Sequence, residues 1–164
     1  MAAFLKTESP KIDGQVTDKD HDKWIEIKSM SSPIFRSIAQ GAKDTQRTQG
    51  DTTLGDIVIV RNLDTSSVEL QKACANGTPI KKITIHFTLQ AKNKQETYLE
   101  YILENVIITS YSIHVNEKGD PTATEELTLA YTKVEWNYTK INPETFNKET
   151  PVRASFEVGK NVGN

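Results

Sequence analysis

Cysteine is nearly absent from this 164-residue sequence, in which Cys74 is the single example. One thiol excludes an internal disulfide framework and a cysteine-based zinc finger. The sequence also lacks any run of about 18 apolar residues, so we expect no insertion into a membrane. Its first nine residues lack a basic segment followed by an apolar one, and they therefore predict no signal peptide.

An excess of charge of either sign is missing too. The 20 Lys and Arg residues nearly balance the 22 Asp and Glu residues, which leaves a net charge of −2. Nucleic-acid-binding domains are usually basic, with a pI above about 9, whereas this chain has a pI near 5.9. We therefore expect no nucleic-acid partner. A hydrophobic content of 36% with so little net charge is typical of a folded chain, and the length predicts one domain over residues 1–164.

Motifs that carry chemistry are lacking as well. The sequence has no G-x-S-x-G, no P-loop, no G-x-G-x-x-G and no H-E-x-x-H. The three histidines lie far apart and lack metal-ligand spacing; they are His21, His86 and His114. The alternating aspartates of residues 18–22 resemble a calcium loop, but the glycine at its sixth position and the glutamate at its twelfth are missing. These absences predict no enzymatic activity, no cofactor and no bound metal.

What the sequence does contain is the period of two that is typical of β-strands. Residues 82–89 show it most clearly, because apolar side chains share one face and polar ones the other. Similar segments predict further strands at residues 24–28, 56–60, 98–115 and 126–141, and weaker ones at 3–7 and 152–158. The β-branched residues of 56–60 favour a strand that is buried on both faces.

Two interruptions break this pattern. Glu104 and Asn105 predict a bulge or bend within residues 98–115. Within residues 126–141 the apolar positions change parity near Thr132 and Lys133, which predicts a bulge or a strand that passes from one sheet to another.

One segment has the signals of a helix, over residues 67–75. Ser66 and Glu69 have the spacing of a capping box, with Ser66 as the N-cap. An apolar stripe that includes Leu70 and Ala73 follows, and Gly77 favours a left-handed end.

Many strands with one short helix predict a mainly β fold, a two-sheet sandwich or barrel. Trp24 and Trp136 lie within alternating segments, so we expect both in the core. Residues 36–55 do not fit this fold, since Ile38 and Leu54 are their only large aliphatic side chains. A loop of this length in a compact domain is usually functional or disordered.

Several segments, in order along the chain, resemble the Hcp family, the tube protein of bacterial type VI secretion systems. The first is KIDGQVTDKDHDKWIEIKS, which starts at Lys11. It is followed by DIVIVRNLDTSS from Asp56, ACANG from Ala73, NVIITSYS from Asn105 and ELTLAYTKVEWNY from Glu126. Residues 32–36 and 155–158 depart from the family pattern. These departures affect what the resemblance implies for the lumen wall and for the C-terminal edge.

The resemblance implies a two-sheet β-barrel or sandwich with one short α-helix and a long extended loop. It implies a homo-hexameric ring, and rings that stack into a tube with the sheath and spike components of the secretion machine. It also implies effector proteins carried in the lumen, and a protein that is cytoplasmic before firing and then secreted. Because the sequence ends at Asn164, directly after the predicted β-domain, we expect no fused toxic domain.

Site residues follow from the same resemblance. Ser31 is expected at the lumen, where effectors would bind. The extended loop is expected to contact neighbouring subunits or rings through six residues, namely Ile38, Lys43, Asp44, Arg47, Asp51 and Leu54. The residues alone leave one alternative open, a monomeric ligand-binding β-domain of the carbohydrate or adhesion kind.

Overall fold

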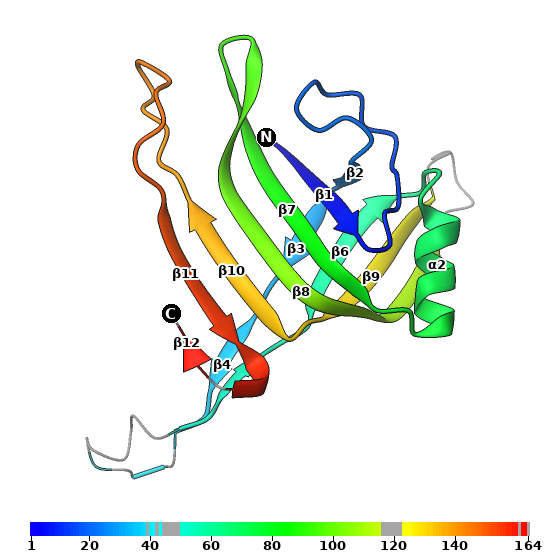
Figure 1. Cartoon of the computed structure of the whole chain (residues 1–164), viewed down its shortest axis with the longest axis vertical. Coiled ribbons are helices and arrows are strands. Elements are labelled where there is room, and N and C mark those ends of the chain that lie inside the picture. Colours follow the sequence, from blue (N-terminus) through cyan, green and yellow to red (C-terminus); the bar gives the residue numbers. More distant parts are fainter. Residues whose placement is uncertain (39, 42, 44–49, 116–122, 161, 164) are drawn as a thin grey trace.

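The computed structural model of the chain describes all residues except 39, 42, 44–49, 116–122, 161 and 164. Its β-strands account for most of the regular structure (Figure 1). They are β1 (Ala2–Glu8), β2 (Ile25–Ile27), β3 (Ser29–Ser31), β4 (Ile34–Arg36), β5 (Thr52–Leu54), β6 (Ile57–Asn62), β7 (Ile80–Ala91), β8 (Lys94–His114), β9 (Thr124–Ala130), β10 (Lys133–Tyr138), β11 (Val152–Glu157) and β12 (Val162–Gly163). The α-helix is α2 (Ser67–Asn76), and a 3-10 turn, η1, covers Val158–Lys160.

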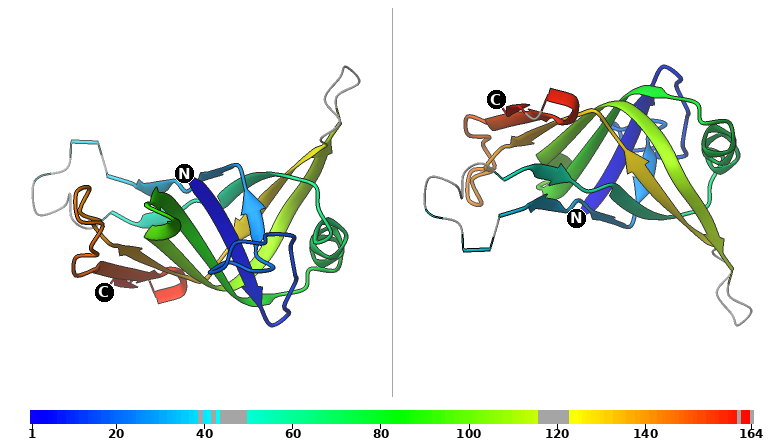
Figure 2. Two further views of the ribbon diagram at one scale, coloured as in Figure 1. Left: turned by 90° about the horizontal axis from the view of Figure 1, so that it is seen from above. Right: turned by 90° about the horizontal axis from the view of Figure 1, so that it is seen from below.

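Ten of these strands form two sheets that share β8. Sheet A has the order β12-β11-β10-β8-β7-β1-β2, and sheet B has the order β3-β6-β9-β8. The two sheets pack face to face and enclose the core (Figure 2). The predicted two-sheet β fold with one helix is therefore confirmed, although the strand order does not close into a hydrogen-bonded ring among the described residues.

Strand β8 belongs to both sheets because it is long and bends near its middle. Its first half pairs with β7 and β10, and its second half pairs with β9. Asn105 lies at the bend with a φ of 51°, a left-handed conformation that asparagine tolerates better than most residues. The predicted bend at Glu104 and Asn105 is confirmed.

The neighbouring chain changes sheets at the same level. β9 belongs to sheet B and β10 to sheet A, and Thr132 lies between them. The Thr132 amide donates to the Glu104 carbonyl over 3.1 Å, and Asn105 Nδ2 donates to Thr132 Oγ1 over 3.2 Å. The predicted change of parity near Thr132 is thus a passage between sheets, and hydrogen bonds tie it to the bend of β8.

The core forms from alternate residues of the strands. On β7, for example, Ile83 and Ile85 are fully buried, and Leu103 of β8 lies opposite Ile83. The expectation for residues 56–60 was only partly right. Ile57 and Ile59 face the core, but Val58 and Val60 are half-buried because they belong to the outer face of sheet B.

Helix α2 begins and ends close to the predicted positions, and Leu70 and Ala73 pack into the core. It ends at Gly77, whose φ is 63° and whose amide donates to the Cys74 carbonyl over 3.2 Å. A left-handed residue at this position usually is glycine because no Cβ opposes the conformation.

The predicted capping box at Ser66 and Glu69 was wrong. Ser66 has helical backbone angles and its hydroxyl makes no capping bond, because Arg61 and Asp64 engage it instead. The reciprocal pair lies two residues earlier: Asp64 Oδ1 accepts from the Ser66 amide over 2.8 Å, and Ser67 Oγ accepts from the Asp64 amide over 3.0 Å.

Candidate functional site

The outer face of sheet B is a surface of small side chains. Ser31 on β3 lies opposite Val58 on β6, which lies opposite Thr128 on β9 and then Ser110 on β8. Ser110 Oγ donates to Thr128 Oγ1 over 2.8 Å. Ser31 is exposed and points away from the core, as the period of two requires with half-buried Met30 beside it.

A second row runs beside the first on the same face. Ser29 lies opposite Val60, which lies opposite Glu126 and then Ser112. Four serines, one threonine and two valines occupy seven of the eight positions in the two rows, with Glu126 at the eighth, so another molecule can approach the backbone of sheet B closely at most positions. Ser31 lies at the edge of this face, and the sequence analysis missed its neighbours because they come from three other strands.

The long loop expected at residues 36–55 begins and ends as a two-stranded ribbon. β4 pairs with β5, with Phe35 opposite Thr53, and the ribbon projects on the side of the molecule away from α2 (Figures 1 and 2). Ile34 and Phe35 are largely exposed on it. The sequence analysis missed these two apolar side chains because the alternation of a three-residue strand is too short to recognise.

The predicted interface residues of the loop lie in different environments. Ile38, Lys43 and Asp51 are exposed, and the Asp51 carbonyl accepts from the Ser37 amide over 3.1 Å. Leu54 is half-buried and packs against the core of its own chain. The remaining two predicted residues, Asp44 and Arg47, lie outside the described residues.

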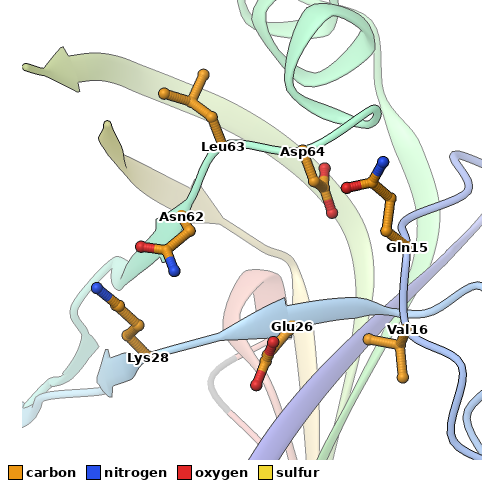
Figure 3. A pocket seen from close by; sticks show the side chains of 7 residues that line it. All are labelled: Gln15, Val16, Glu26, Lys28, Asn62, Leu63 and Asp64. Carbon is orange, nitrogen blue, oxygen red and sulfur yellow. The ribbon is translucent and has the colours of Figure 1, made fainter. Parts of the chain in front are cut away.

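A polar pocket of about 230 Å³ lies between β2 and the segment that joins β6 to α2 (Figure 3). Seven side chains line it, those of Gln15, Val16, Glu26, Lys28, Asn62, Leu63 and Asp64. Asp64 is already engaged, because Arg61 Nη2 and the Ser66 hydroxyl both contact its carboxylate. The remaining groups carry charges of both signs and do not select one class of ligand.

Two histidines that the sequence separates by 65 residues meet on the outer face of sheet A. His21 lies in the connection between β1 and β2 and is buried, and its Nε2 is 3.0 Å from His86 Nδ1 on β7. Asp18 and Glu100 bind the two outer ring nitrogens, each over 2.7 Å. The sequence analysis placed His86 correctly on the polar side of its strand, but it did not foresee that the connection covers it.

Trp24 corrects a related expectation. It was predicted in the core, yet Ile25 and Ile27 take the core positions of β2, so Trp24 and Glu26 point the other way. The Trp24 ring instead contacts His21 and His86, with centroid distances of 4.9 and 4.7 Å. Trp136 does pack against the core, as predicted.

Burial and the contacts of the two histidines shift the pKa values of Asp18, His86 and Glu100. The hydrogen bond from His21 holds the pKa of Asp18 below its usual range. Burial lowers the pKa of His86. Burial alone would raise the pKa of Glu100, but hydrogen bonds from Asn137 and His86 outweigh it and lower that pKa.

A second polar cluster is buried between sheet B and α2. Arg61 is 1% exposed, and its Nη1 lies 2.8 Å from Oε1 of the fully buried Glu125. This contact is an ion pair by distance, but its angle is not that of a hydrogen bond, so Oε1 lacks a directed donor. Burial and the hydrogen bond to Glu125 both raise the pKa of Tyr111. The cluster stabilises the junction of β6, α2 and β9.

Within the described part of the chain, no three His, Cys, Asp or Glu side chains come together in a way that could hold a metal ion. Cys74 is a free thiol that packs partly against the core. None of the helices in the described ranges is long and apolar enough to cross a membrane.

Comparison with solved structures shows a shared fold. The chain superposes on "Structure of a type six secretion system protein" with a TM-score of 0.90 and 20% identity, over 99% of both chains. It superposes on Hcp1 from Salmonella typhimurium with a TM-score of 0.78 and 20% identity, over 99% of this chain and 98% of the other. A type VI secretion system effector from Yersinia pestis gives a TM-score of 0.71 and 20% identity, over 95% and 99% of the two chains.

Comparison with curated protein sequences gives no match. The model of one protein family, described as "Type VI secretion system effector, Hcp", matches residues 4–138. That range contains strand β8, which the two sheets share, helix α2, and the contacting residues Asp18, His21, His86 and Glu100. The chain therefore belongs to the Hcp family of type VI secretion system effectors.

Proposed function

We propose that this chain is a structural subunit of the type VI secretion tube and not an enzyme. Six copies would form a ring, and rings would stack into a tube that engages the sheath and spike components and leaves the cell from the cytoplasm. The single domain of residues 1–164 would be the repeating unit. The observation that carries the proposal, beyond family membership, is the projecting ribbon of β4 and β5 with its exposed apolar side chains.

The apolar side chains of the ribbon would bury more of their surface against a neighbouring subunit than they bury against their own domain. Phe35 is 60% exposed and Ile34 is 53% exposed. Full burial of such a side chain contributes about 1.5–3 kcal/mol. Burying the exposed halves of both would therefore contribute about 1.5–3 kcal/mol per subunit, and a ring repeats the contact at each interface.

The outer face of sheet B fits the wall of a carrier. Its serine and threonine side chains, Ser31 among them, are short and leave room for an effector. Ser31 makes no part of the core of its own chain. We therefore assign Ser31 to the cargo-facing surface.

The solution mass tests the assembly. A hexamer of 18.4 kDa chains has a mass of 6 × 18.4 kDa, about 110 kDa, and light scattering separates it from the monomer that a ligand-binding module would form. The Ile34→Ser/Phe35→Ser variant should assemble less well than the wild type. Val68→Ser is the matched control, because Val68 is 71% exposed on α2, away from the ribbon. A wild-type chain that stays monomeric at every concentration would refute the proposal.

A further inference from the structure

Four titratable groups form an unbroken line on the outer face of sheet A. Asp18 Oδ1 lies 2.7 Å from His21 Nδ1, His21 Nε2 lies 3.0 Å from His86 Nδ1, and His86 Nε2 lies 2.7 Å from Glu100 Oε2. The line begins in the connection between β1 and β2, crosses to β7 and ends on β8. Asn137 of β10 donates to the far oxygen of Glu100 over 2.7 Å, which fixes that end.

The three contacts set a proton count. A hydrogen bond between two such atoms needs one proton, so three contacts need three protons. Two neutral imidazoles supply one N–H each, and two ionised carboxylates supply none. With two protons only, His21 and His86 would each donate to a carboxylate, and their other nitrogens would direct two bare lone pairs at each other across 3.0 Å.

We propose that the pair His21–His86 binds one additional proton, which lies in the contact between the two rings and latches the β1–β2 connection onto sheet A. The proton gives the four groups a net charge of −1. Its loss leaves the two lone pairs facing each other, and the gain of a further proton places two imidazolium ions in contact. The latch is therefore closed in one protonation state and opens on both sides of it.

Aromatic contacts between the connection and the sheet surround this latch, whereas Ile12 at the start of the connection packs in the core independently of it. The His21 ring stacks on Phe4 of β1 with a centroid distance of 4.5 Å, and Trp24 packs beside both histidines. Gly14 lets the connection fold tightly, since a Cβ there would lie 2.3 Å from the Trp24 carbonyl oxygen. Release of His21 would expose Phe4 and Trp24 while β1 stays paired with β7.

Other charged groups among the described residues act on the pair from a distance, and they do not supply the missing proton. Lys6 of β1 lies 6.0 Å from the Trp24 ring. Lys148 and Arg153 act on His86 and Glu100 from the C-terminal side at longer range. Thr97 Oγ1 is 3.4 Å from His86 Nδ1, so its hydroxyl can reach only one of the two facing lone pairs, and weakly.

The acidities of the neighbours agree with a proton shared between the rings. The pKa values of Asp18 and Glu100 are both lowered by their hydrogen bonds, which keeps both carboxyls ionised, so the third proton belongs to an imidazole nitrogen. Burial lowers the pKa of His86, so the shared proton has to be held by the hydrogen bond between the two rings against that burial, and a further proton is opposed as well. A pocket of about 250 Å³, lined by His86 and Glu100 among others, connects the line with solvent.

The sign of the pH dependence follows from linkage. Two unfolded histidines together hold one proton at a pH near their ordinary pKa of about 6.5. Below that pH the unfolded chain binds more protons than the latch, so stability rises with pH; above it the latch holds more, so stability falls. The stability of the chain should therefore pass through a maximum near pH 6.5, and it should level off once the folded chain has lost the shared proton.

Solid-state nitrogen-15 spectra of the histidine-labelled full chain count the protons directly. At pH 6.5 we expect three protonated and one bare nitrogen among the four ring nitrogens of His21 and His86. Spectra of His86→Gln and His21→Gln assign the signals. Two protonated nitrogens at that pH, or four, would overturn the proposal.

Urea unfolding between pH 5.5 and 8.5 supplies the second readout. The wild-type midpoint should peak near pH 6.5, and His86→Gln should lose the peak. His114→Gln is the control, since His114 is exposed at the far end of β8 and should leave the peak unchanged. A wild-type midpoint that changes in one direction only would also overturn the proposal, even if His86→Gln fails to fold.

Discussion

Replacing Arg61 with methionine tests the energetics of the buried cluster. Methionine matches the length of the arginine stem but carries no charge, so Arg61→Met leaves Glu125 fully buried without its ion-pair partner. Among the residues that the structure describes, Glu125 then keeps the hydroxyl of Tyr111 as its donor. Asp64 is less affected, because the Ser66 amide and hydroxyl still donate to it.

The expected loss is large because a charge remains behind. Breaking a buried ion pair by removing one partner costs about 3–5 kcal/mol. With a urea m-value of about 2 kcal/mol per molar, the unfolding midpoint should fall by about 1.5–2.5 M. Circular dichroism at pH 7 over a urea series measures this shift, and the m-value itself shows whether unfolding remains two-state.

Two comparison variants show how much of the loss comes from leaving Glu125 as an unpaired buried charge. The double variant Arg61→Met/Glu125→Leu should recover most of the loss, since apolar residues often replace a buried pair at no net cost. That outcome is favoured by Glu125 Oε1, which lacks a directed donor in the native pair. Lys133→Met breaks an exposed pair with Glu104 at 3.8 Å and should cost less than about 1 kcal/mol. If Arg61→Met costs no more than Lys133→Met, the pair is not desolvated and the reasoning is wrong.

Three further outcomes can be measured. Glu69→Ala should change stability by less than about 0.5 kcal/mol, because Glu69 makes no cap. Ser67→Ala should cost about 1 kcal/mol, because it removes the hydrogen bond from the Asp64 amide. If urea midpoints show Glu69→Ala to be the more destabilising variant, the capping box at Ser66 is correct after all. Ser31→Gln should leave ring assembly intact in electron micrographs and impair effector binding, and a failure of the rings themselves would show that Ser31 packs between subunits. Replacing residues 42–50 of the extended loop with a short Gly-Ser link should leave the circular dichroism spectrum unchanged and abolish ring stacking and secretion. Tubes that still form at normal yield would show that the loop is dispensable.

Local patterns were sufficient to predict the longer strands and the helix, but not the short strands β3, β4, β5 and β12. Side-chain alternation depends only on the backbone geometry of a strand, so residues 82–89 and their counterparts could be identified without knowledge of their partners. The bend at Asn105 was visible because the residue type suits a left-handed conformation. The passage between sheets near Thr132 was visible because a change of parity is also local.

Contacts between distant segments could not be predicted in the same way. The pairs Arg61–Glu125 and His21–His86 each join residues more than 60 positions apart, and no periodicity records which strands will be neighbours. The capping box failed for a related reason. Its spacing was correct, but Arg61 in the preceding strand engages the Ser66 hydroxyl and leaves Asp64 to cap the helix.

The shared strand β8 has a mechanical consequence. Its 21 residues run through both sheets, an extended path of roughly 65–70 Å, and β7, β10 and β9 all hydrogen-bond to it. A force that pulls the two sheets apart is therefore resisted by the covalent backbone of one continuous strand that connects them. β8 is an interior strand of sheet A and the edge strand of sheet B, so it cannot leave one sheet without disrupting the other, and load applied to one sheet is passed to the other.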